Sequence, residues 1–278
     1  MTVSNAGIVD FGDFTLVWDS MASEFAAADL RRAAEKLTCK PVSILVNSHH
    51  HMDHIRGNQV FFGSQIVSSV MTRDLLQERI RRFQREVNDF PALLEKTQAK
   101  LALETEKIKR KILEAQIREL QSELEIVKSL IPTFPTLTFE TKLELHGSKR
   151  SAKILEFAGH TRSDSVLVID DEILFAGDLI LEKHLGFMGH GNPEIWLETL
   201  TKLEGLKFKT IMPGHGKPSD RHLISNMRIY IDQMLELGKT IKSQDELERV
   251  EIPESWQEWG LLEGFKYNLE FLFERKTS

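Results

Sequence analysis

The chain has 278 residues, of which 41% are hydrophobic and 28% are charged. This composition is typical of an ordinary globular protein with room for one large α/β domain or two smaller ones. The formal net charge of −6 argues against a general nucleic-acid-binding protein. Cys39 is the only cysteine, which excludes an intrachain disulfide and a thiolate metal cluster.

The sequence shows no sign of a targeting or membrane segment. Residues 1–7 lack the basic region and the apolar stretch of a signal peptide. No apolar run approaches the roughly 20 residues that span a bilayer. We therefore expect a cytoplasmic protein without a membrane partner.

The first part of the chain alternates predicted strands and helices. Two short strands over 6–11 and 14–18 flank a Gly12-Asp13 turn, which is a hairpin signal. An apolar stripe predicts a helix over 23–37, and a β-branched run predicts a buried strand over 42–47. A short helix from Gly57 and a strand over 65–69 follow.

Residues from about 72 to 131 differ from everything around them, because they contain no glycine and are dense in charged residues and glutamine. Asp89-Phe90-Pro91 predicts a helix end and a restart. We therefore expect a helical hairpin, with helices over about 72–88 and 91–130. The second helix carries a coiled-coil-like seam of Leu113, Ile117, Leu120, Leu124, Val127 and Ile131. The first carries Arg79, Arg81, Arg82 and Arg85, interpreted as a solvated face, with attraction of an anionic substrate as the alternative.

Strands and helices alternate again after the insertion. Strands are predicted over 136–139, 142–145, 153–157, 165–169, 172–176 and 209–212, and helices over 193–204, 219–239 and 261–274. The alternation on both sides of the insertion predicts a single α/β domain over residues 1–278, interrupted at about 72–131.

The most informative segment follows the strand at 42–47 and reads Ser48-His49-His50-His51-Met52-Asp53-His54. Residues i and i+2 of an extended segment project to the same side, so His49 and His51 can hold one ion together. Asp53 and His54 follow where the chain must turn and can face a second ion. Imidazole and carboxylate suit a divalent ion such as zinc. The alternative is a histidine-rich surface loop.

Three later segments each end an apolar strand on a candidate ligand. These ligands are His160 after Phe157-Ala158-Gly159, Asp178 after Leu174-Phe175-Ala176-Gly177, and His215 after Ile211-Met212-Pro213-Gly214. Gly-His and Gly-Asp pairs are common in turns, so each signal is weak alone. As an ordered set behind His49-x-His51-x-Asp53-His54 they are specific, because strand ends project side chains into a shared cleft.

With these residues the chain resembles the metallo-β-lactamase superfamily of hydrolases, over nearly its whole length outside the insertion. The resemblance implies an αβ/βα sandwich of two mixed β-sheets flanked by helices, with the site along one edge. It also implies that His49, His51 and His160 hold a first metal ion, that Asp53, His54 and His215 hold a second, and that Asp178 bridges both.

The chain departs from the family pattern in three ways. Position 178 is aspartate, as in the glyoxalase II and lactonase branches, whereas classical β-lactamases of the family carry cysteine or serine there. Residues 4–7 resemble a motif that usually follows an earlier strand, so we expect a missing edge strand and a sheet that is open or completed by a partner. The helical insertion lies outside the common core. The most similar branch is a group of uncharacterised hydrolases with Ala-Gly-Asp followed by a segment like Gly189-His190-Gly191-Asn192-Pro193.

Other polar residues have two interpretations each. Asp19 is a candidate partner of a metal-binding histidine, or a turn aspartate. We expect His50 to point away from His49 and His51, which favours core or surface packing over metal ligation. His184 and His190 lie in the loop after Asp178, where each is either a substrate contact or an ordinary loop residue. His146 and His222 are expected at the surface.

Two divalent ions about 3.5–4 Å apart can share a hydroxide, because they lower the pKa of its parent water from roughly 15.7 toward 7. We therefore expect a dinuclear zinc-dependent hydrolase acting on a small-molecule ester, lactone, thioester or amide through a metal-bridging hydroxide. Asp53 is the candidate catalytic residue that orients the hydroxide or relays its proton. Iron and manganese are alternative metals.

Several alternatives stay open. They are a β-lactamase, a phosphodiesterase or nuclease of the same superfamily, and a metal-binding assembly protein that uses the coiled-coil-like arm. We expect a small-molecule substrate and no nucleic-acid partner. A homodimer through the insertion or an edge strand is also left open.

Overall fold

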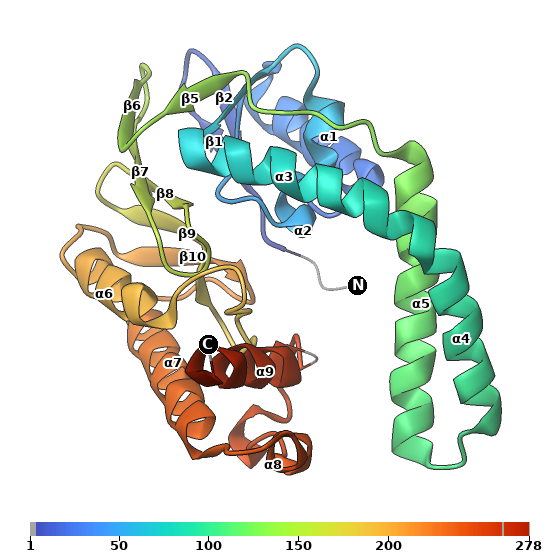
Figure 1. Ribbon diagram of the computed structural model, residues 1–278. Coiled ribbons are helices and arrows are strands. Elements are labelled where there is room, and N and C mark those ends of the chain that lie inside the picture. The colour runs from blue at the N-terminus through green and yellow to red at the C-terminus, as the bar shows by residue number, and fades with distance from the viewer. Residues whose placement is uncertain (1–3, 263, 278) are drawn as a thin grey trace.

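The structure is a computed structural model that describes residues 4–262 and 264–277. Among these, the side chains of residues 107–109, 112, 115, 119, 126–128 and 277 are not described. In the described chain, strands form two five-stranded sheets (Figure 1). The first sheet has the order β1-β2-β3-β4-β5 and the second the order β10-β9-β8-β7-β6.

The strands of the first sheet are β1 (Gly7–Asp10), β2 (Thr15–Trp18), β3 (Val42–Val46), β4 (Gln65–Ser69) and β5 (Leu137–Phe139). Those of the second are β6 (Lys142–His146), β7 (Ser151–Phe157), β8 (Asp164–Ile169), β9 (Ile173–Leu181) and β10 (Thr210–His215). In the first sheet β1 pairs antiparallel with β2 and the other neighbours run parallel. In the second, β9 and β10 run parallel and the other neighbours antiparallel. Both sheets are therefore mixed.

The helices are α1 (Glu24–Thr38), α2 (Met52–Ile55), α3 (Val70–Glu86), α4 (Phe90–Leu103), α5 (Lys107–Ser129), α6 (Pro193–Glu204), α7 (His222–Thr240), α8 (Gln244–Arg249) and α9 (Gly264–Thr277). Short 3₁₀ turns are η1 (Arg56–Phe61), η2 (Val87–Asp89) and η3 (Glu254–Trp256). Gly57, where a short helix was predicted to begin, lies in η1, and neither α2 nor α8 was predicted. Within the described chain, no helix combines the length and the apolar character needed to cross a membrane.

Alternating side chains on the strands divide the core into layers. In β2, Leu16 packs between the two sheets, whereas Val17 packs against α1. In β8, Leu167 packs between the sheets, whereas Val168 joins the cluster formed with α6, α7 and α9. The order is therefore helix, sheet, sheet, helix, which confirms the predicted αβ/βα sandwich (Figure 1).

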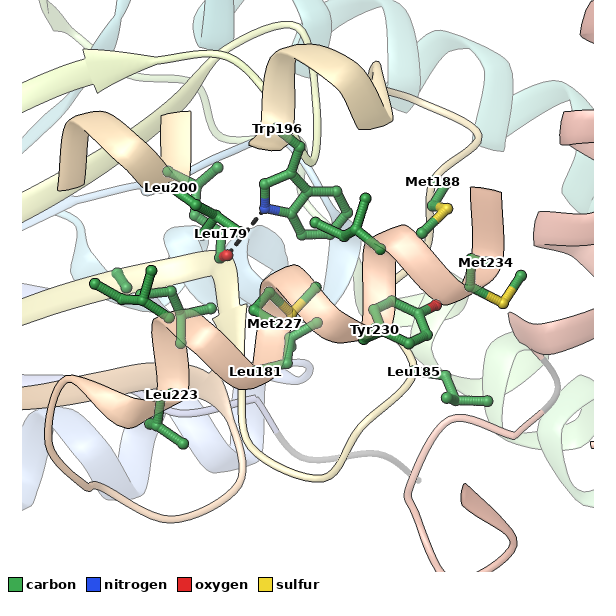
Figure 2. Packing of buried hydrophobic residues seen from close by; sticks show 14 of the residues in the cluster. Leu179, Leu181, Leu185, Met188, Trp196, Leu200, Leu223, Met227, Tyr230 and Met234 are labelled. Carbon is green, nitrogen blue, oxygen red and sulfur yellow. Dashed lines mark hydrogen bonds between the residues drawn. The ribbon is translucent and has the colours of Figure 1, made fainter. Parts of the chain in front are cut away.

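The core of the second sheet holds the strand that carries Asp178. Figure 2 shows Trp196 of α6 beside Leu179 of β9, with Met227 and Tyr230 of α7 close by. The indole Nε1 of Trp196 donates a hydrogen bond to the Leu179 carbonyl oxygen at 2.9 Å. Because Trp196 and Leu179 are fully buried, this contact fixes the backbone next to Asp178.

Strands β9 and β10 are longer than predicted. The predicted ends at 176 and 212 lie before Gly177 and Pro213, residues that usually interrupt strands. In the structure the pairing continues past both, with register irregularities beside Pro213, and Gly177 adopts a φ of 52°. Asp178 and His215 therefore lie within strands, and the irregularities re-aim these side chains.

The insertion differs from the predicted pair of helices. The chain passes from α3 through η2 into α4, and the predicted long helix is broken at residues 104–106. The Glu104 carboxylate accepts hydrogen bonds from the backbone N–H groups of Thr105 and Glu106, both at 2.8 Å, which competes with helical bonding. The hairpin thus consists of α4 and α5, and it extends beyond the two-sheet core (Figure 1). Val127 of the predicted seam lies outside the described side chains.

The segment before β1 is attached to the end of β10. Asn5 donates from its backbone to the Gly214 carbonyl oxygen at 2.7 Å, and its side chain donates to the carbonyl oxygens of Pro213 and Gly216. Ser4 donates to the carbonyl oxygen of Asp53 at 2.6 Å. These contacts tie the first sheet to the second beside the candidate ligands.

Candidate metal centre

The seven predicted ligands lie together although they come from distant parts of the chain. His49 and His51 follow β3, and Asp53 and His54 lie in α2. The others are His160 after β7, Asp178 in β9 and His215 at the end of β10. The structure places their ligand atoms in two neighbouring groups.

The first group consists of His49, His51, His160 and Asp178, whose ligand atoms lie within 4.8 Å of one another. The Nδ1 atom of His51 is 3.0 Å from Nε2 of His160. Oδ2 of Asp178 is 3.5 Å from Nε2 of His160 and 3.8 Å from Nε2 of His49. Three imidazoles and one carboxylate therefore surround one point.

The second group consists of Asp53, His54 and His215, again within 4.8 Å of one another. Oδ2 of Asp53 is 3.1 Å from Nε2 of His215 and 3.5 Å from Nε2 of His54. Asp178 also faces this group, because its Oδ1 is 3.2 Å from Nε2 of His54 and its Oδ2 is 3.5 Å from Nε2 of His215. Asp178 thus lies between the two groups.

These distances fit a divalent ion in each group. Ligands about 2.0–2.1 Å from a tetrahedral zinc ion stand roughly 3.3 Å from one another, close to the separations found. Nε2 of His49, Nε2 of His54 and Oδ1 of Asp178 are buried and have no hydrogen-bond partner among the described residues. Buried polar atoms are rarely left in this state, so the three atoms fit a site that could hold cations.

Asp19 orients two of the histidines, which agrees with the first of the two interpretations left open for it. Its Oδ2 accepts a hydrogen bond from Nδ1 of His54 at 2.8 Å and another from the Ser48 hydroxyl at 2.8 Å. The Ser48 oxygen is 2.9 Å from Nδ1 of His49 and accepts a hydrogen bond from its N–H group, since the Ser48 hydroxyl hydrogen is donated to Asp19. Both Nε2 lone pairs then face the two groups. Ser48 was not singled out in the sequence, where nothing but its position before His49 marks it.

Burial controls the protonation of the first group. It lowers the pKa of His160 to about 4, and it lowers the pKa values of His49 and His51 well below the usual range. Neighbouring imidazoles contribute in the same direction. These histidines are therefore neutral at neutral pH, the state in which imidazole binds a metal ion.

Carboxylates determine the protonation of the second group. Burial alone would lower the pKa of His215, but the charge of Asp178 and hydrogen bonds with Asp178 and Asp53 raise it to about 9. Burial is likewise outweighed at His54, whose pKa the charges of Asp178, Asp53 and Asp19 raise well above the usual value. Without a metal ion this group therefore holds protons on its imidazoles, in the place that a cation would take.

His50 does not point away from its neighbours, so that expectation was wrong. Its ring centroid is 4.9 Å from that of His51 and 5.5 Å from that of His190, and it is only 5% exposed. The chain bends over residues 48–50, so consecutive side chains do not alternate as they would on a strand. His50, His51 and His190 form a third cluster of imidazoles.

The loop after Asp178 brings two more histidines to the site. Nδ1 of His190 is 2.8 Å from Nε2 of His51, and the His184 ring lies 5.6 Å from that of His215. Substrate contact by either residue stays a prediction. His146 and His222 are exposed, as expected.

The arginines of α3 differ in their exposure. Arg81, Arg82 and Arg85 are exposed, whereas Arg79 is half-buried. Burial is the main cause that lowers the pKa of His50 to about 3, and the Arg79 guanidinium contributes to it. The Arg79 charge therefore acts on His50, while Arg79 pairs with Glu86 at 3.1 Å.

Comparison with known proteins agrees with this geometry. The family model of the metallo-beta-lactamase superfamily matches residues 2–215, and the chain belongs to that superfamily. It is therefore a metal-dependent hydrolase, in a superfamily whose members bind divalent metals.

Two solved structures show the same fold. A metallo-beta-lactamase from Pontibacter korlensis is 17% identical, with a TM-score of 0.60 over 83% of this chain and 95% of that chain. A metallo-beta-lactamase from Hirschia baltica is 18% identical, with a TM-score of 0.57 over 82% of this chain and 85% of that one. At this identity the similarity concerns the fold alone.

Proposed function

We propose that the chain is a dinuclear zinc hydrolase of a small-molecule ester, lactone, thioester or amide. His49, His51 and His160 would hold one ion, Asp53, His54 and His215 the other, and Asp178 would bridge them. The observation that carries the proposal is the place of Asp178, within 3.8 Å of ligand atoms in both groups. One carboxylate between two sets of imidazoles favours two ions over one.

Two bound ions would supply a nucleophile at neutral pH from water and would polarise the substrate's carbonyl oxygen. Asp53 is suited to proton transfer because its side chain is 32% exposed, whereas that of Asp178 is 7% exposed. In the proposed role Asp53 accepts a proton from the attacking water and returns it to the leaving group, while Asp178 stays ionised.

The surroundings favour a small substrate with an apolar part. The half-buried Phe187 ring lies 6.1 Å from the His51 ring, on the side of the loop after β9. Aspartate rather than cysteine or serine at position 178 supports the ester, lactone and thioester classes over β-lactams. Zinc is the favoured ion because imidazole dominates the ligand set.

The test is metal analysis combined with hydrolysis assays of wild type and Asp178→Asn. We expect two zinc ions per wild-type chain, fewer than one per variant chain, and a loss of turnover above about 100-fold, since even outer partners of a metal ligand contribute 10–100-fold. Asp220→Asn, at an exposed residue, is the control. Esters, lactones, thioesters, amides, β-lactams and phosphodiesters form the substrate panel. A single bound ion, or full activity after metal removal, would refute the proposal.

A further inference from the structure

The two ring nitrogens of His51 face different partners. Nδ1 lies 3.0 Å from Nε2 of His160 inside the first group, and Nε2 lies 2.8 Å from Nδ1 of His190 in the loop after β9. A neutral imidazole has one N–H group, so only one of these nitrogens offers a lone pair to a cation.

We propose that His190 is a positioning residue that fixes the tautomer of His51; this rests on the proposed metal-binding role of the first group. His190 accepts a hydrogen bond from Nε2–H of His51 through its Nδ1. The His51 proton is thereby held on Nε2, and the Nδ1 lone pair is kept for the metal ion. Asp19 does the same for His54, and Ser48 for His49, so His190 is a third partner of this kind.

Hydrogen bonds with residues of α7 and α9 fix the start of the loop that carries His190. Asn268 of α9 accepts a hydrogen bond from the Met188 backbone N–H at 2.8 Å. Tyr230 of α7 and the Asn268 amide both donate to the Gly186 carbonyl oxygen at 2.8 Å. Because Tyr230 and Asn268 are fully buried, the start of the loop has a fixed position.

The end of the loop is held against the residue before His160. The Asn192 backbone N–H donates to the Gly159 carbonyl oxygen at 3.0 Å, and its side chain caps α6 by accepting from Ile195 N at 3.0 Å. A Cβ at Gly191 would lie 2.1 Å from the Gly159 oxygen and 2.4 Å from the His160 oxygen. Only glycine permits this approach, which places the His190 ring beside His51.

These contacts account for Gly189-His190-Gly191-Asn192-Pro193, a segment that the proposed ligand set leaves unexplained. Gly191 allows close backbone contact, and Asn192 with Pro193 starts α6. His190 is the side chain that this arrangement presents to the site. The Phe187 ring, 5.0 Å from the His190 ring and edge-on, supports it from the side.

A matched pair of variants tests the proposal. His190→Ala removes the acceptor, whereas His190→Asn keeps an acceptor oxygen near the position of Nδ1. His222→Ala, at an exposed histidine paired with Asp220, is the control. Affinity for added Zn²⁺ is measured by chelator competition, and the tautomer of His51 by ¹⁵N NMR of the metal-free protein.

We expect the Ala variant to bind the first-group ion 10–100-fold more weakly, with two ions still bound at saturation. We expect the Asn variant to bind this ion with an affinity within about threefold of that of wild type. In metal-free wild type and the Asn variant the His51 proton resides on Nε2, and in the Ala variant both tautomers appear.

Unchanged affinity and tautomer in the Ala variant would overturn the proposal. A third zinc ion in wild type that the Ala variant loses would also overturn it, because His190 would then be a ligand with His50 and His51. Failure of wild type to bind two ions refutes the proposed function, while the tautomer readout still reports on His190.

Discussion

Two glycines determine how closely the strands approach around Asp178. Gly177 has a φ of 52°, a conformation that side chains rarely adopt. A Cβ at Gly214 would lie 1.9 Å from Oδ1 of Asp178 and 2.7 Å from the carbonyl carbon of Gly177. The position of the Asp178 carboxylate therefore depends on the absence of a side chain on the neighbouring strand.

Gly214→Ala should displace Asp178 and lower zinc affinity by at least about tenfold, in the range seen when support of a metal ligand is lost. Chelator competition measures the effect. Gly205→Ala is the matched control, because its φ is −76° and its Cβ would meet nothing closer than the Lys202 oxygen at 3.3 Å. Equal affinity of the two variants would contradict the argument.

Asp164, at the start of β8, accepts hydrogen bonds from the backbone N–H and hydroxyl of Thr161 at 2.9 Å. Burial raises its pKa from 3.8 to about 7. The folded, metal-free protein therefore keeps this proton between about pH 4 and 7, where the unfolded chain has lost it. The contribution of Asp164 to the free energy of unfolding is therefore fully present below about pH 4, and it is lost as the pH rises through 7.

We expect the Asp164→Asn substitution to weaken the pH dependence of the free energy of unfolding. Between pH 4.5 and 7.5 the free energy of unfolding of metal-free wild type should fall relative to the variant by a few kcal/mol, at about 1.4 kcal/mol per pKa unit. Urea denaturation across the range measures the difference. Parallel curves for the two proteins would show that Asp164 is ionised in the folded state.

At the scale of elements, an ion pair joins the ligand segment to the insertion. Arg56 follows α2 and meets Glu123 of α5 through two hydrogen bonds, of 2.9 and 2.5 Å. The Arg56 side chain is 9% exposed and lies 5.3 Å from the Phe83 ring of α3. Helix α5 therefore supports the turn that carries Asp53 and His54.

Glu123→Ala should lower the free energy of unfolding by about 2–3 kcal/mol. This is less than the roughly 3–5 kcal/mol for a fully buried pair, because Glu123 stays 20% exposed. Urea denaturation measures the loss. Glu114→Ala on the same helix breaks an exposed pair with Arg110 and should cost under about 1 kcal/mol; an equal loss in both variants would contradict the role of Arg56.

At the scale of the whole molecule, the hairpin of α4 and α5 stands apart from the sandwich (Figure 1). Leu93 and Leu103 of α4 are 46% and 85% exposed, so the arm presents apolar side chains to solvent. The second sheet, with α6, α7 and α9, forms a separate core. A homodimer through this arm, or through an edge strand, stays a prediction from the sequence.

Replacing residues 96–114 by a short Gly/Ser turn would shorten the arm while keeping Glu123. We expect zinc content and hydrolysis to be retained and any dimer to dissociate, as measured by light scattering. Loss of turnover at full zinc content would instead show that the arm acts on the substrate.

Local patterns in the sequence predicted much of this fold. The Gly12-Asp13 turn, the β-branched run of β3 and the apolar stripe of α1 each predicted an element that lies close to its expected range. The break at residues 104–106 was missed because Glu104 stops the helix through its side chain, without glycine or proline. The ends of β9 and β10 were missed because the bulged pairing accommodates Gly177 and Pro213.

The sequence by itself determined the class of site, since His49-x-His51-x-Asp53-His54 and the three later residues carry ligand chemistry in their identities and order. Only the tertiary structure decided how those residues are used. It set which ring nitrogen of each histidine faces inward, placed Asp178 between two groups, and brought His50 and His190 against His51. These outcomes depend on contacts between segments far apart in the chain, where hydrogen-bond partners and burial are fixed by packing rather than by sequence spacing.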